Sequence, residues 1–124
     1  YDSIALEAVV TRSDILQLQQ LAAHVFIEDS VLDYILRIVG ATRTEAEFRA
    51  GVSVRGGLAL KHAVQARSLL EGRDFVVPED VQALVGPVLA HRLTLVRPAS
   101  DGMEERRLVV AALKRIVSSI TPPV

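Results

Sequence analysis

Apolar residues recur at helical spacing in several segments of this chain, and this periodicity is the feature that most constrains its fold. In the last such segment they stand three or four positions apart and line one face of a helix: Val109, Ala112, Leu113, Ile116 and Ile120. With three phenylalanines, two tyrosines and no tryptophan, the core must be built mostly from Leu, Ile, Val and Ala. The sequence predicts a mainly α fold of five or six helices joined by short extended segments.

Residues that favour helix starts and stops give approximate bounds for these helices. Ser53 is a good N-cap, Gly72 stands where a helix commonly ends, and Pro78 suits a first helical turn. Gly86-Pro87 should interrupt the helix that begins at Pro78. We predict helices over residues 12–23, 28–43, 53–71, 78–85, 88–92 and from 104 to the prolines at 122–123, extended segments at 25–27, 75–77 and 93–96, and a loop over 44–51.

Two of the predicted helices carry stripes that we expect to be buried. In the helix over 28–43 the stripe is Val31, Leu32, Ile35, Leu36, Ile38 and Val39. In the helix over 53–71 it is Gly56, Ala59, Leu60, Ala63, Ala66 and Leu70, whose small members would let a neighbouring helix approach closely. Glu79 and Asp80 are interpreted as acidic residues that complement a helix dipole, without a catalytic role.

Length and composition limit the classes of protein that this chain can represent. Its 124 residues fit one domain, with residues 11–124 as a single helical unit and residues 1–10 as a lead-in from a missing upstream part. With 14 basic and 15 acidic residues, it lacks the net positive charge that nucleic-acid binding requires, although Arg43, Arg49 and Arg55 are predicted to form a local basic patch. No apolar run is long enough to cross a membrane, and we expect a cytoplasmic protein.

The residue types also argue against a metal site and against hydrolase chemistry within this chain. There is no cysteine, and His24, His62 and His91 are too dispersed to suggest metal ligands. No serine stands in the strand–turn–helix setting of a nucleophile elbow. Residues 51–57 are rich in glycine but lack the lysine of a phosphate-binding loop, so we expect no cofactor to bind the chain alone.

Arg55 stands at a position that is unfavourable for its charge. It falls in the first turn after the Ser53 cap, where a positive charge opposes the helix dipole by about 0.3–1 kcal/mol. A helix start also exposes backbone N–H groups that attract anions, so a bound phosphate would contact both the arginine and the helix end. Gly56 and Gly57, which are unfavourable inside a helix, would permit close packing or close approach of a ligand. The residues alone leave two interpretations open: Arg55 points into water, or it binds an anion.

Several short motifs follow one another in a recognisable order along residues 9–96. With residues 51–55, Gly-Val-Ser-Val-Arg, this order resembles the helical lid of MoxR-family AAA+ ATPases, whose sensor 2 helix starts with Gly-Ala-Ser-Pro-Arg. Residues 71–81 resemble its Gly-Arg-Asp-Tyr-Val-Thr-Pro-Glu-Asp-Val segment, and residues 87–93 its Pro-Val-Leu-Arg-His-Arg segment. Tyr34-Ile35 and Thr42-Arg43 match the helix that precedes the sensor. Val54 replaces the usual proline, a departure that leaves the orientation of Arg55 open.

The resemblance implies a role in ATP hydrolysis that this chain cannot perform alone. In this family the lid packs over ATP and Mg²⁺ held by a separate core, which supplies the catalytic motifs. By resemblance, Arg55 would be the sensor 2 arginine that reaches the γ-phosphate, and Ser53 would cap its helix beside the nucleotide. The full-length protein would be a chaperone-like ATPase that forms a ring, expected to be a homo-hexamer, and works with a von Willebrand factor A-domain protein.

Two other interpretations stay open from the sequence. The first is the lid of a magnesium-chelatase-type or other AAA+ protein, whose distinguishing insertions would lie in the core. The second is a free-standing helical protein-interaction module with no link to nucleotide. Such a module would need no arginine at a capped helix start, so Arg55 separates it from the lid.

Overall fold

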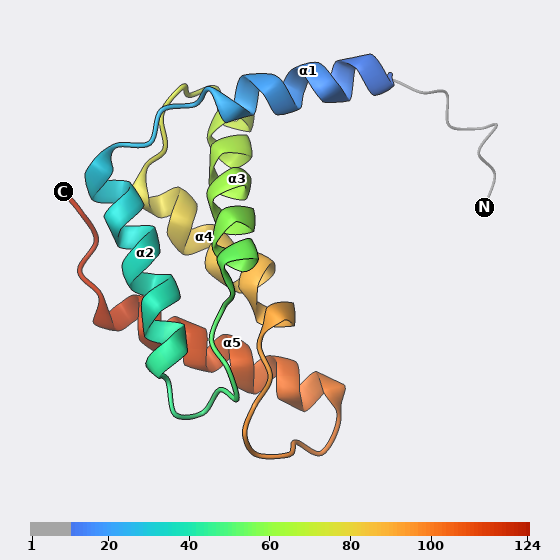
Figure 1. Ribbon diagram of the computed structural model, residues 1–124, viewed down its shortest axis with the longest axis vertical. Helices are drawn as coiled ribbons and strands as arrows, with labels where there is room; N and C mark the ends of the chain where they lie inside the picture. The colour runs from blue at the N-terminus through green and yellow to red at the C-terminus, as the bar shows by residue number, and fades with distance from the viewer. Residues whose placement is uncertain (1–10) are drawn as a thin grey trace.

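The computed structural model describes residues 11–124, and this part of the chain contains five α-helices and one short 3₁₀-helix (Figure 1). They are α1 (Arg12–Ala23), α2 (Asp29–Thr44), α3 (Val54–Leu70), α4 (Pro78–Leu89), η1 (Ala90–Arg92) and α5 (Gly102–Ser119). The predicted mainly α fold is confirmed, and each α-helix starts within two residues of its predicted position. Residues 1–10, the predicted lead-in, lie outside the described residues.

Four of the helices enclose an aliphatic core, and the fifth projects from it. Helix α3 packs against α2 and α4, while α5 crosses the lower ends of α2 and α4 (Figure 1). The apolar side chains with 0 % exposure at the centre are Ile38, Leu60, Val64, Val81, Leu89 and Ala112. Helix α1 contacts the far end of α3, and none of its residues is buried.

The predicted extended segments are confirmed as two isolated β-bridges between connections. Phe26, before α2, pairs in parallel with Phe75, before α4. Phe48, before α3, pairs in the antiparallel direction with Leu95, before α5. The predicted loop over 44–51 therefore contains a core anchor that the sequence did not reveal, because Phe48 is only 5 % exposed.

The predicted stripe of α3 is partly wrong. The buried residues are Gly56, Leu60, Val64, Gln65 and Ser68. Leu70, which was expected in the stripe, is 82 % exposed. Polar residues take its place because they satisfy backbone groups of the connections: Gln65 Nε2 donates to the carbonyl oxygen of Val25 at 2.9 Å, and Ser68 Oγ donates to that of Phe75.

The predicted stripe of α2 needs a similar correction. Leu36 is 60 % exposed and Leu32 is only partly buried, whereas Tyr34 and Thr42 are buried. The hydroxyl of Tyr34 accepts a hydrogen bond from Gln82 on α4 at 3.3 Å. Because the tyrosine hydroxyl has a hydrogen-bond partner, the large side chain of Tyr34 can be buried in the core.

The prediction that Gly86-Pro87 interrupts the fourth helix is wrong. Helix α4 runs through Pro87 to Leu89 and passes directly into η1. A proline inside a helix removes one hydrogen bond and costs roughly 3 kcal/mol or more. Val81, Val85 and Leu89 offset this cost, because they are at most 2 % exposed and hold the turns on both sides of the proline against the core.

No helix between residues 11 and 124 is long and apolar enough to span a lipid bilayer.

Candidate functional site

The start of α3 is capped as the sequence predicted. Ser53 Oγ accepts a hydrogen bond from the backbone N–H of Gly56 at 3.2 Å, and the Ser53 carbonyl oxygen accepts one from Gly57 at 3.0 Å. The backbone N–H groups of Val54 and Arg55 have no acceptor within the described part of the chain. These two donors therefore point outward at a helix start, the arrangement that suits an anion.

The side chain of Arg55 extends from this helix start into solvent. It is exposed, and it forms no ion pair with any residue from 11 to 124. The first turn of α3 contains no acidic residue, whereas that of α4 contains Glu79 and Asp80. Nothing within this part of the chain therefore offsets the repulsion between Arg55 and the helix dipole.

The end of α2 fixes the segment that leads into α3. Thr42 Oγ1 donates to the carbonyl oxygen of Val39 at 2.6 Å and accepts from the N–H of Val52 at 3.0 Å. Arg43 Nε donates to the carbonyl oxygen of Val52 at 3.0 Å. A Cβ atom on Gly51 would lie 2.4 Å from the Cα of Arg43, so only glycine fits there. The Thr-Arg and Gly-Val-Ser motifs thus meet in space and set the position of Arg55.

Arg92 is a second cationic residue at this helix start, and no local signal in the sequence indicates that it lies there. A Cβ atom on Gly56 would lie 3.2 Å from the Cδ of Arg92 and 2.6 Å from Cγ1 of Val52. The bare backbone of Gly56 therefore makes room for the aliphatic stem of Arg92 beside the turn that carries Arg55. Arg92 is exposed at the end of η1, so its guanidinium can reach solvent in front of α3.

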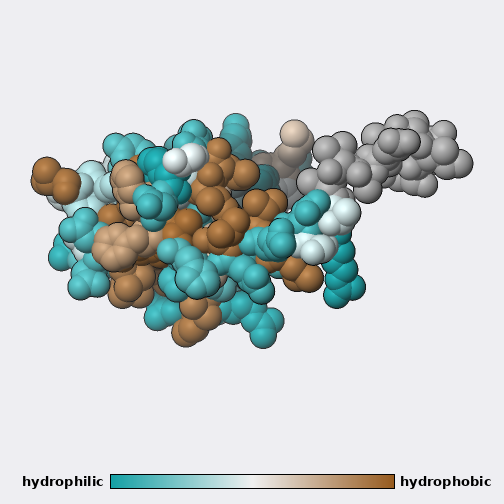
Figure 2. Space-filling view, turned by 90° about the horizontal axis from the view of Figure 1, so that it is seen from above, coloured by the Kyte–Doolittle hydropathy of each residue, from teal (hydrophilic) through white to brown (hydrophobic). Residues whose placement is uncertain are grey.

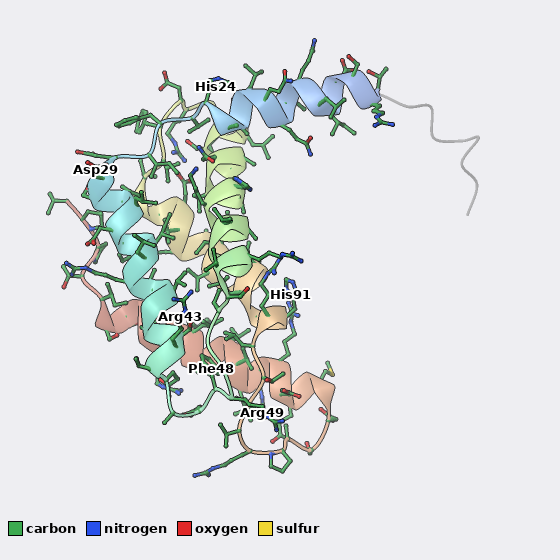
Figure 3. The ribbon with its side chains drawn as sticks, viewed as in Figure 1. His24, Asp29, Arg43, Phe48, Arg49 and His91 are labelled. Carbon is green, nitrogen blue, oxygen red and sulfur yellow. The ribbon has the colours of Figure 1, made fainter. Side chains whose placement is uncertain are left out.

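The predicted patch of Arg43, Arg49 and Arg55 is divided among three elements. Arg43 lies at the end of α2, where its Nε is bound to Val52, and Arg49 lies in the following connection (Figure 3). The backbone N–H of Arg49 donates to the carbonyl oxygen of Thr94 at 2.9 Å, which ties this segment to the connection before α5. A joint basic surface of the three side chains stays a prediction.

Arg55 shares the outward face of α3 with an apolar groove. His62 and Leu69 follow Arg55 at intervals of seven residues, so all three lie along one side of the helix. Along this side, α1 and α3 border a groove of about 600 Å³, with apolar lining residues that include Ile15, Leu18, Ala22, Ala63, Ala66 and Leu69. Ile15 and Leu18 remain 47 % and 45 % exposed. One opposing surface could cover the groove and Arg55 together.

The motif over residues 71–81 forms a buried ion pair at the other end of α3. Asp80 is 1 % exposed, and its two carboxylate oxygens accept hydrogen bonds from Arg73 at 2.7 and 2.9 Å. One of these oxygens also accepts from the backbone N–H of Val77 at 2.9 Å, and Arg67 Nε lies 3.7 Å from the other. The interpretation of Asp80 as a helix-start charge is therefore incomplete, because it also anchors the connection between α3 and α4.

The balance of forces keeps Asp80 ionised. Burial raises the pKa of this carboxyl, but the hydrogen bonds from Arg73 and Val77 and the charges of Arg73 and Arg67 outweigh burial, so the pKa lies below its usual range. The hydrogen bond to Asp80 likewise raises the pKa of Arg73. Since Arg73, Asp80 and Arg67 satisfy one another, this cluster has a structural role.

The three histidines stay apart in the fold. His24 caps α1, His62 lies on α3 and His91 on η1 (Figure 3). Within residues 11–124, no group of three or more His, Cys, Asp or Glu side chains is placed to hold a metal ion.

Comparison with known proteins identifies the family. Residues 40–112 match the family model described as the AAA lid domain. Over 120 residues the chain is 38 % identical to protein YeaC of Bacillus subtilis, an alignment that covers 96 % of this chain and 36 % of YeaC. Over 124 residues it is 29 % identical to chaperone MoxR1 of Mycobacterium tuberculosis, covering 93 % of this chain and 32 % of that protein.

Two further comparisons agree. Protein MoxR of Paracoccus denitrificans is 43 % identical over 77 residues, which cover 60 % of this chain and 22 % of that protein. The crystal structure of a Cytophaga hutchinsonii protein to which ATPase activity is attributed superposes with a TM-score of 0.77 at 25 % identity, covering 93 % of this chain and 37 % of the other.

The chain spans about a third of the length of YeaC and MoxR1. The family model matches more than half of it, and the MoxR relatives carry the same segment. The chain therefore belongs to the AAA lid domain family and is a helical lid of the MoxR type of AAA+ protein.

Proposed function

We propose that this lid closes over ATP held by the core of the same protein, with Arg55 as the sensor 2 arginine that contacts the γ-phosphate. The observation that carries the proposal is the exposed guanidinium of Arg55 at a capped helix start, without an acidic partner in the described chain. Together with the free N–H groups of Val54 and Arg55, it offers an anion one full charge and several donors. Ser53 supports this arrangement as the cap beside the nucleotide.

The attachment of α3 to α2 supports a coupling role for the lid. Val52, the residue just before the Ser53 cap, donates its N–H to Thr42 and accepts a hydrogen bond from Arg43, and Thr42 and Arg43 both lie at the end of α2, a helix whose buried residues lie in the core. A phosphate that pulls on Arg55 would therefore move α2 and α3 as one body. Loss of the γ-phosphate on hydrolysis would release that body, which is how the lid would convert hydrolysis into motion.

The groove between α1 and α3 supports closure onto a core. An isolated helix as short as α1, with 12 residues, is marginal in water, and four of its large apolar side chains are about half exposed: Ile15, Leu16, Leu18 and Leu21. This surface is stabilised if another part of the longer protein covers it. Ala66 lies eleven residues from Arg55 on the same helix, or about 16 Å. A core that binds ATP at Arg55 would therefore reach the groove as well.

The activity of the longer protein follows from these proposals and from its relatives. We propose an ATPase that uses ATP and Mg²⁺, bound mainly by the core, and that assembles as a ring, in a hexamer of identical subunits. A chaperone role is proposed from the similarity to MoxR1, which is described as a chaperone. A von Willebrand factor A-domain partner and a cytoplasmic location complete the proposal.

The test is steady-state ATP hydrolysis by the full-length protein that carries Arg55→Ala. Turnover should fall on the order of 100-fold, the scale of one preorganised donor to a transition-state charge. Nucleotide affinity should change much less, because the core supplies most contacts. Arg37→Ala is the matched control, since Arg37 is another exposed arginine and, among residues 11–124, pairs only with Asp33 on α2. Equal turnover of the Arg55 and Arg37 variants would refute the sensor role.

A further inference from the structure

Two phenylalanines from distant parts of the sequence lie side by side on the surface, at the end of α3 that is remote from Arg55. Phe26 is 62 % exposed and Phe75 is 46 % exposed. They form the parallel bridge, in which the N–H of Phe26 donates to the carbonyl oxygen of Asp74 and the N–H of Val76 donates to that of Phe26, both at 2.9 Å. Bridge partners project from the same face of a strand pair, so the two rings share one surface.

Two carboxylates line a surface hollow together with these rings. A surface hollow of about 420 Å³ is lined by Phe26, Glu28, Asp74, Phe75 and Val76. Glu28 and Asp74 are exposed, and neither takes part in an ion pair within residues 11–124. Asp29 follows at the start of α2 (Figure 3). In the view from above, hydrophobic side chains form a band that hydrophilic ones border (Figure 2). The hollow thus joins two aromatic rings to two carboxylates with no cation of its own.

The chain already shows which group suits such a surface. The guanidinium of Arg73 lies 5.9 Å from the centre of the Phe75 ring and binds Asp80 through two hydrogen bonds. It thereby makes two contacts that suit arginine, a cation–π contact with an aromatic ring and a bidentate bond to a carboxylate. Because the charge of Arg73 is satisfied by Asp80, it does not neutralise Glu28 or Asp74.

We propose that this aromatic patch (Phe26, Glu28, Asp74 and Phe75) binds an arginine-bearing segment of a protein partner. A purely apolar partner would cover Glu28 and Asp74 without pairing their charges, which is strongly unfavourable. An anionic partner, such as an acidic lipid surface, would be repelled. A guanidinium stacks on the exposed rings and donates to the carboxylates, so it satisfies all four side chains at once.

The patch is independent of the proposed nucleotide contact. Arg55 and Glu71, at the two ends of α3, are separated by sixteen residues, or about 24 Å along the helix. The arginine-binding surface therefore does not overlap the proposed nucleotide contact at Arg55. It offers the longer protein a place to recruit a basic client or an adaptor, and its failure would leave the sensor proposal intact.

The test is a titration of the ¹⁵N-labelled 124-residue chain, followed by NMR, with a short capped peptide that contains two arginines. Binding should shift the amide signals of Phe26, Glu28 and Asp74. The same peptide with citrulline in place of arginine keeps the shape but loses the charge, and it should bind at least tenfold more weakly. Raising the salt concentration should weaken binding of the arginine peptide, because salt screens the charges of the exposed carboxylates.

Variants of the chain separate the aromatic contact from general hydrophobic docking. The double variant Phe26→Leu/Phe75→Leu keeps the apolar surface and removes both rings. It should weaken binding of the arginine peptide roughly 5- to 30-fold, which is the affinity that corresponds to the loss of two exposed cation–π contacts. Leu36→Ser and Asp33→Asn, exposed positions on α2, are the matched controls and should bind as the parent does.

Three results would overturn the proposal. The first is equal binding of the arginine and citrulline peptides. The second is unchanged binding by the double leucine variant. The third is a shift of the Phe26 and Asp74 signals with protein concentration in the absence of peptide, which would show that a second copy of the chain covers this surface.

Discussion

Replacing Asp80 by asparagine should destabilise the fold through the ion pair that anchors the connection between α3 and α4. One carboxylate oxygen accepts from Arg73 alone, with Arg67 nearby, and the other accepts from both Arg73 and the N–H of Val77. An amide has only one oxygen. In either orientation its NH₂ group would face a donor in place of an acceptor, so at least one hydrogen bond is lost and two donors are brought together.

The magnitude follows from the burial of the site. Removing one partner of a buried ion pair costs about 3–5 kcal/mol. The lower end applies here, because the side chain of Arg73 is 25 % exposed and regains water once its partner is gone. A loss of about 3 kcal/mol, with a urea m-value of about 1.5 kcal/mol/M, lowers the unfolding midpoint by roughly 2 M.

Equilibrium urea unfolding of the 124-residue chain, followed by circular dichroism, measures this shift. The control is Asp33→Asn, which breaks an exposed pair with Arg37 and should cost less than about 1 kcal/mol. The double variant Arg73→Met/Asp80→Leu should recover part of the loss, because it removes both charges together. A midpoint for Asp80→Asn within about 0.5 M of that for Asp33→Asn would refute the assignment of Asp80 as a buried anchor.

Three further predictions concern the same helices. Gly51→Ala should destabilise the chain by about 1–3 kcal/mol in urea unfolding, because the added Cβ would meet the backbone of Arg43. Gly86→Ala is the control, because open space surrounds that position, and equal unfolding midpoints for the two variants would contradict the prediction. Ser53→Ala should cost about 1 kcal/mol in the same assay, and Ser53→Asp should restore the cap; a neutral alanine variant would show that the cap is dispensable. The pKa of Asp80 is lowered on folding, so the stability that its charge contributes is complete above the unfolded pKa of about 3.9 and is lost as the pH falls through the folded pKa. The difference in unfolding free energy between the parent and Asp80→Asn should therefore be constant from about pH 7 to 5 and should narrow below about pH 4.

The starts of the helices and the family could be predicted from the sequence, because they depend on local signals. The cap at Ser53, the positive-φ glycine at Gly72 and the proline that opens α4 act within one helical turn, and all three are confirmed. The position of Arg55 in the first turn of α3 is likewise a matter of counting from the cap. Its exposure is the expected state of a charged residue at such a position.

The burial of polar residues was decided by the tertiary structure alone. Gln65 lies in the core because its amide reaches the carbonyl of Val25, a residue 40 positions away. Asp80 was expected to act within its own turn, but Arg73 from the preceding connection closes over it. Helix periodicity predicts that such polar residues are exposed, because the local pattern contains no information about a hydrogen-bond partner on another element.

The same distinction holds for the candidate site. By itself the sequence determined the capped helix, the arginine in its first turn and the motifs that mark the lid, because each depends on residues adjacent in the chain. Only the tertiary structure placed Arg92 beside Gly56 and continued α4 through Pro87. These outcomes depend on the packing of α4 and η1 against the core and α3, and contact energies between distant segments, summed over the whole core, outweigh the preference of any single residue.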